Sequence, residues 1–170
     1  MKFTKEEKKF WKTHYHFDKP SHIKNDWHQI WSVDNSEDDD YFYFFTLRVT
    51  SIVDVYLKAS LITDKAVEYM TKFKELKYLV LRQHKNITKA SIPYFNQMQH
   101  LESLNITKTK ITLTDLCEQL NNQSLKEVFL DSEEDEENIL EKAFILKERM
   151  PTCSIYVDTS DPDGEKPIFF

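Results

Sequence analysis

The chain has 170 residues and a mass of 20.4 kDa, and its 23 basic and 29 acidic side chains give a formal net charge of −6. This length suits one domain with a single core, and the negative charge disfavours binding to nucleic acid or to anionic lipid. Glycine occurs once, at Gly164. Phosphate-binding loops and nucleophile elbows use glycine where the backbone approaches a ligand or takes a positive φ, so the sequence nearly excludes both classes of site.

The sequence also carries no signal for membrane insertion or secretion. Residues 1–9 are rich in lysine but no apolar run follows them, and no stretch reaches the length of about 18 apolar residues that a membrane span needs. We therefore expect a cytoplasmic protein. Cys117 and Cys153 are too few to indicate a disulfide scaffold.

Residues 1–48 contain more than half of the aromatic residues of the chain. We predict a short helix over residues 5–13. The segments 27–33 and 41–47 are rich in β-prone residues and flank a polar stretch at 34–40, which predicts a β-hairpin. We expect this α/β segment to cap the structure that follows it.

A repeated pattern occupies the rest of the chain, at steps of 24, 25, 24 and 25 residues. Each copy holds three apolar residues, separated by two variable residues and then by one. The five copies are Ile52, Val55 and Leu57; Leu76, Leu79 and Leu81; Leu101, Leu104 and Ile106; Leu125, Val128 and Leu130; Met150, Cys153 and Ile155.

A helix is predicted after each of the first three strands. Thr63, Thr88 and Thr112 each follow an isoleucine and are suitable N-caps. Apolar residues at helical spacing come next, so each copy predicts a strand, a turn and a helix. The helix-spaced residues are Ala66, Met70 and Phe73; Ile92, Phe95 and Met98; Leu113, Leu116 and Leu120.

Over residues 48–158 this pattern resembles the leucine-rich repeat family. The resemblance implies a short right-handed solenoid with parallel strands on the concave face and helices on the convex face. We expect a capping segment at 1–48, an array of about five units at 49–158 and a tail at 159–170. The family often has asparagine three residues after the last apolar position. This sequence departs from that rule, and the bends are expected to depend on Ser60, His84, Thr109, Glu133 and Asp158.

Few residues suggest chemistry. His14, His16, His22 and His28 gather in the first segment, and two of them, His14 and His16, would share one side of a strand. Zinc binding is therefore one alternative, although scattered histidines of a capping segment explain the pattern more simply. Both cysteines lie at expected core positions. We assign no catalytic residue, metal or cofactor.

The predicted concave face is the most informative surface. Strand residues that alternate with the core should form rows across the sheet, and the repeat aligns Phe129 with Ser154 and Asp131 with Tyr156. Aromatic residues and arginine are common binding hot spots. The candidate partner-binding residues are Asp54, Tyr56, Lys58, Tyr78, Val80, Arg82, Asn105, Glu127, Phe129, Asp131 and Tyr156.

The sequence therefore favours a non-enzymatic module that binds a protein partner. Acidic runs at 37–40 and 133–137 could steer a basic partner, and one specific form is a bacterial immunity-type inhibitor of a basic toxin. The alternatives are a substrate-recruiting adaptor that docks through residues 1–48, and a metal-binding protein. The oligomeric state is not indicated.

Overall fold

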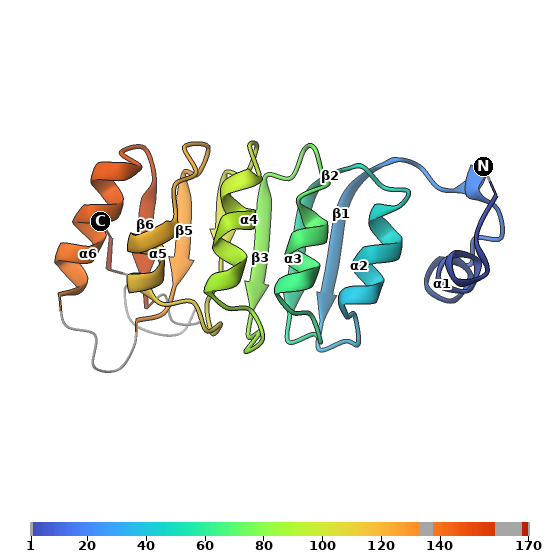
Figure 1. The fold of residues 1–170 in the computed structure, drawn as a ribbon, viewed down its shortest axis with the longest axis horizontal. Coiled ribbons are helices and arrows are strands. Elements are labelled where there is room, and N and C mark those ends of the chain that lie inside the picture. Colours follow the sequence, from blue (N-terminus) through green and yellow to red (C-terminus); the bar gives the residue numbers. More distant parts are fainter. Residues whose placement is uncertain (1, 133–137, 159–167, 170) are drawn as a thin grey trace.

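The computed structural model describes residues 2–132, 138–158 and 168–169 (Figure 1). Within these ranges, seven strands form one sheet in which each strand lies beside its neighbour in chain order. Strands β1 to β6 are parallel and alternate with helices, and β7 pairs antiparallel with β6. The predicted α/β class with a parallel sheet is confirmed.

The strands are β1 (Asp26–Val33), β2 (Ser51–Lys58), β3 (Tyr78–Arg82), β4 (Ser103–Asn105), β5 (Glu127–Leu130), β6 (Ser154–Val157) and β7 (Ile168–Phe169). The α-helices are α1 (Lys5–Tyr15), α2 (Asp39–Thr46), α3 (Asp64–Met70), α4 (Ile92–Gln97), α5 (Leu113–Gln119) and α6 (Ile139–Arg149). Two 3₁₀ turns are η1 (Pro20–His22) and η2 (Lys89–Ser91).

Figure 1 shows helices α2 to α6 as one row along the sheet, with α1 beyond β1 and α2 at the N-terminal end. None of the helices in the described ranges has the length and apolar character needed to cross a membrane.

The core lies between the sheet and this row of helices. Val55 pairs in register with Leu79, Leu79 with Leu104, and Leu104 with Val128, and all four side chains are fully buried. Side chains alternate between the two faces of a strand, so each buried residue is followed by one that points away from the helices. The predicted alignment and burial of the apolar residues in the first four copies are confirmed.

The fifth copy was predicted in the wrong register. Val128 pairs with Ile155, a step of 27 residues, and Cys153 precedes strand β6. The reason is the longer helix in this unit: α6 has 11 residues, whereas α5 has 7. Met150 and Cys153 are buried, as expected of core residues, but they lie between the helix and the strand.

The predicted hairpin over residues 27–47 is wrong. Strand β1 pairs parallel with β2, and the second β-prone segment forms helix α2. The side chain of Asp38 accepts a hydrogen bond of 3.0 Å from the backbone N–H of Tyr41 and so caps the helix. Helical spacing then buries Phe42 and Phe45 together. The predicted N-terminal helix is present as α1.

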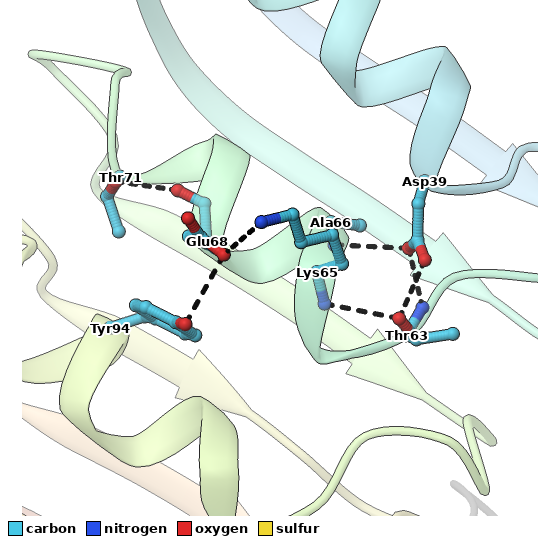
Figure 2. Close-up of polar contacts among 7 residues, drawn as sticks. All are labelled: Asp39, Thr63, Lys65, Ala66, Glu68, Thr71 and Tyr94. Atoms are coloured by element: carbon cyan, nitrogen blue, oxygen red, sulfur yellow. Dashed lines mark hydrogen bonds and ion pairs between the residues drawn. The ribbon is translucent and has the colours of Figure 1, made fainter.

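Aspartates join the starts of successive helices. Asp39 accepts hydrogen bonds from the backbone N–H of Thr63 at 2.8 Å and from its hydroxyl at 2.7 Å (Figure 2). One unit later, Asp64 accepts the same pair of bonds from Thr88, at the same two distances. Each threonine in turn caps its own helix. Thr112 caps α5 in the same way, so the three predicted N-caps are confirmed, and Thr63 and Thr88 are also fixed by the preceding unit.

We expect the Asp64→Ala variant to lose about 1–3 kcal/mol of unfolding free energy, because it leaves the Thr88 N–H and hydroxyl without their acceptor. Chemical denaturation measures this loss. Asp18→Ala, at an exposed site between α1 and η1, is the control and should change stability by less than about 0.5 kcal/mol. Equal effects of the two variants would contradict a structural role for the hydrogen bonds between Asp64 and Thr88.

The turns after the strands are made without glycine. Asp34, Ala59, Gln83 and Lys108 have φ values of 52°, 53°, 62° and 58°, in the left-handed region. At three of them the backbone N–H donates to a carbonyl of the next unit: Asp34 to Lys58, Ala59 to Arg82 and Gln83 to Thr107. The residues that directly follow β1, β2 and β3 therefore adopt a strained left-handed backbone, and this conformation extends the hydrogen bonding between strands by one residue.

Ala59→Gly should raise the unfolding free energy by about 0.5–1 kcal/mol, because glycine removes the Cβ penalty of the left-handed region and this gain exceeds its entropic cost. The matched control is Ala90→Gly in η2, an exposed site outside the left-handed region. The control should lower the unfolding free energy by about 0.5–1 kcal/mol. A loss of stability at Ala59 in thermal or chemical unfolding would contradict this interpretation of the turn.

Mixed polar contacts hold the bends. Ser60 donates its backbone N–H to Nε2 of the buried His84 at 3.1 Å, and the Thr109 hydroxyl donates to the Ile106 carbonyl at 2.8 Å. Asp158 accepts from the backbone N–H of Ser132 at 2.7 Å. Glu133 and the acidic run 133–137 lie outside the described residues, as does most of the predicted tail.

Stability should depend on pH through His84. Burial lowers the pKa of its imidazole, and Nε2 must stay unprotonated to accept the Ser60 N–H. The folded state therefore binds this proton more weakly than the unfolded state, whose pKa is about 6.5. The stabilisation is present above pH 6.5 and is lost as the pH falls toward the lower pKa of the folded state.

We expect the difference in unfolding free energy between the wild type and His84→Gln to shrink below pH 6.5, by at most about 1.4 kcal/mol per pH unit. Denaturation at several pH values measures it. A difference that stays constant from pH 7 to pH 5 would show that His84 does not titrate as described.

Candidate functional site

The face of the sheet that points away from the helices is called the outward face here. It is formed by alternate side chains of β1 to β6. At its centre the register aligns six residues, named the central row: Trp31, Tyr56, Val80, Asn105, Phe129 and Tyr156.

Ten of the predicted binding residues lie in the strands and on this face, and all of them are half-buried or exposed. They are Asp54, Tyr56 and Lys58 in β2; Tyr78, Val80 and Arg82 in β3; Asn105 in β4; Glu127 and Phe129 in β5; and Tyr156 in β6. Asp131 lies just after β5, and its carboxylate accepts a hydrogen bond from the Lys108 backbone N–H. Asp131 therefore also has a role in the turn.

The predicted rows need one correction at β6. The two-residue shift places Tyr156 beside Phe129, in the central row, and Ser154 beside Glu127. Tyr156 was expected to pair with Asp131. The corrected register lets the rings of Phe129 and Tyr156 stack, with centroids 4.5 Å apart and planes 9° from parallel.

Sequence reasoning missed Trp31, which is the most exposed aromatic residue described, with 68% of its surface accessible. Its ring lies 5.9 Å from that of Tyr56, centroid to centroid. A step of 25 residues aligns Trp27, Ile30 and Ser32 with the first copy of the repeat. Ser32 is polar at the third apolar position, so this unit does not show the apolar pattern of the five copies.

The outward face carries charges of both signs. Lys58 and Arg82 are paired neighbours on β2 and β3, Asp54 also lies on β2, and Glu127 lies on β5. Arg82 also covers the buried Thr107, donating from Nε to its hydroxyl at 3.2 Å. Near the first end, Asp54 is half-buried, and this burial raises the pKa of its carboxyl while His28 partly opposes the increase.

The histidines of the first segment do not form the predicted arrangement. His14 lies in helix α1 and His16 is its left-handed C-cap, so the two do not share one side of a strand. Over the parts of the chain that the structure describes, no three His, Cys, Asp or Glu side chains come together as a metal site.

The two cysteines have structural surroundings. Burial raises the pKa of the Cys153 thiol to about 12, which keeps it protonated and a poor nucleophile. The Cys117 sulfur lies 3.1 Å from the Lys142 carbonyl oxygen and can donate to it.

No protein-family model matches this chain, and the search of curated proteins found no match.

Proposed function

We propose that this protein is a non-enzymatic binding module and that a protein partner docks on the outward face. The observation that carries the proposal is the central row. Four of its six members are aromatic, and they form one pair at each end: Trp31 with Tyr56, and Phe129 with Tyr156. Tryptophan, tyrosine and arginine dominate binding hot spots, and Arg82 lies beside the row.

We further propose that the parallel sheet lines the concave side of a short right-handed solenoid of the leucine-rich repeat kind. Three features support this: the strand order follows the chain, the steps between paired strands from β2 to β5 are regular, and helices alternate with strands. In such an array, neighbouring units together form one long concave surface. The partner would then contact several strands together.

The proposed partner is a basic protein. The chain has a net charge of −6, and its acidic side chains, with Glu127 of β5 among those on the outward face, could guide such a partner during encounter. A narrower form of the proposal is a cytoplasmic bacterial inhibitor of the immunity type that neutralises a basic toxin. The small size and the acidity of this chain support the immunity-type form of the proposal.

Co-purification from the native cells, followed by mass spectrometry, tests the proposal first. A basic protein recovered in a stoichiometric complex is the expected result. Recovery of the intact chain alone, under low-salt conditions that preserve weak complexes, would contradict it.

Alanine variants then locate the interface. Tyr56→Ala, Arg82→Ala and Phe129→Ala should each weaken partner binding by about 1–4 kcal/mol, as truncation of hot-spot residues does. Isothermal titration calorimetry measures the change. Tyr43→Ala is the matched control, because Tyr43 is an exposed tyrosine on helix α2. If the control weakens binding and the three face variants do not, the partner uses the helices.

A further inference from the structure

Strand β1 is an edge of the sheet. It pairs with β2 on one side only, whereas at the opposite end of the sheet β6 is followed by β7. The strand has eight residues and contains neither proline nor lysine, two residue types that commonly protect an edge strand from further pairing. A long edge of this kind is a template on which another strand can form.

The hydrogen bonds to β2 show which peptide groups of β1 point to the free side. The Asp34 N–H donates to the Lys58 carbonyl at 2.9 Å. The Val33 carbonyl belongs to the same trans peptide group and therefore points away from β2. Peptide groups alternate sides along a strand, so the N–H and C=O of Gln29, Trp31 and Val33 point to the free edge. Within the described ranges, no hydrogen bond from another segment reaches these groups.

Two neighbouring pockets follow this edge. One, of about 320 Å³, is lined by strand residues 29–32, and the other, of about 350 Å³, by strand residues 26–29. Trp31 packs beside Tyr56 on the outward face, whereas Ile30 and Ser32 are buried on the helix side. Residues that point to opposite faces can line one pocket together only at the backbone edge that they share. The two pockets therefore form one groove beside β1, which is named the edge groove.

Helix α1 and the residues after it form the far wall of the edge groove. His14 and Tyr15 of α1 line the first pocket, and Phe17 and His22 line the second. Figure 1 shows α1 beyond β1 and α2 at this end of the protein. A groove that is bounded on both sides suits one extended chain. A second copy would instead bring its own helices into the space that α1 already occupies.

The lining of the edge groove indicates which side chains an added strand would carry. The first pocket includes the polar side chains of Asn35 and Glu37, and the second includes the aromatic rings of Phe17 and Trp27. A polar side chain would suit the first pocket and an apolar one the second. On the outward face, a neighbouring strand would cover the exposed ring of Trp31.

We propose that the edge groove receives one extended segment of the protein partner, which joins the sheet as a strand beside β1. The backbone of this segment would pair with the free N–H and C=O groups of Gln29, Trp31 and Val33, as in other complexes formed by strand addition. The inference rests on the proposed function for the existence of the partner and adds the way in which it binds. Because Trp31 belongs to the central row, the added strand would continue the outward face.

Hydrogen exchange of backbone amides, followed by NMR on the full chain, tests the free edge first. The N–H groups of Ile30 and Ser32 point toward β2 and should exchange slowly. Those of Trp31 and Val33 should exchange at least about 10-fold faster, because no backbone carbonyl protects them. Equal protection of the two pairs would overturn the inference, since the edge would then already be paired.

The probe for strand addition is a synthetic peptide in which threonines and valines alternate, followed by two lysines for solubility. The comparison peptide has the same side chains and charge but carries N-methyl groups on three consecutive central residues, which removes backbone donors. Titrations use about 0.15 M salt to screen long-range attraction. We expect saturable shifts and slower exchange of the Gln29, Trp31 and Val33 amides with the first peptide, and at least about 10-fold weaker binding of the second.

A proline variant locates the binding edge. Gln29→Pro removes one outward N–H at a position where an edge strand tolerates proline, and it should weaken binding of the first peptide about 10-fold. The matched control is Lys85→Pro. The Ile87 N–H donates to the His84 carbonyl, so Lys85 is the second residue of a turn, where proline is favoured. The control should bind the peptide like the wild type, and cooperative thermal melting of both variants shows that the fold is intact.

Three further results would overturn the inference: no saturable shift of these amides, equal binding of the two peptides, or a wild-type dimer that Gln29→Pro converts to a monomer in sedimentation. The last result would assign the edge to a second copy. These experiments need no partner, so the edge groove and the proposed function can fail separately. A partner that protects Tyr56 and Tyr156 from oxidation but leaves the exchange of Trp31 and Val33 unchanged removes strand addition alone. A partner that slows this exchange without protecting the tyrosines removes the outward face as the interface.

Discussion

Each strand from β1 to β6 pairs in parallel register with the next, and this pairing positions both the core and the outward face. A single strand and helix cannot bury their apolar side chains alone, so each unit must lie in register on the next. Once Val55, Leu79 and Leu104 are aligned and buried, the residues that alternate with them are aligned on the opposite face. The core and the central row are thus two consequences of one pairing pattern. The left-handed turns at Ala59 and Gln83 continue that pairing beyond the strands, at the cost of local backbone strain.

Polar contacts between units complement the apolar core. Asp39 and Asp64 each satisfy the donors at the start of the following helix, so the row of helices keeps the spacing of the strands. At the N-terminal end, Glu7 is buried against Arg48, with 2.7 Å between the carboxylate oxygen and the guanidinium nitrogen. This ion pair joins α1 to the segment after α2. For the proposed partner, an outward face held in one shape by these contacts would lower the entropic cost of binding.

The sequence predicted the register of β2 to β5 because apolar residues occupy every core position there. It failed at both ends, for different physical reasons. At the first unit, Ser32 interrupts the apolar pattern, and the aromatic residues of α2 have high β-propensity although the Asp38 cap starts a helix. At the last unit, the longer helix α6 shifts the strand by two residues, which a fixed period cannot show. Ten of the eleven candidate residues could be placed on strands from their spacing. Trp31 could not, because its place in the central row depends on the pairing of β1 with β2.

The proposed function requires that the partner contacts the outward face and not the row of helices. Hydroxyl-radical footprinting distinguishes the two, since both faces carry reactive aromatic side chains. Binding of the co-purified partner should protect Trp31, Tyr56 and Tyr156 from oxidation while leaving Tyr43 and Tyr94, on helices α2 and α4, as reactive as in the free protein. Protection of Tyr43 and Tyr94 with no change at Trp31, Tyr56 and Tyr156 would contradict the claim.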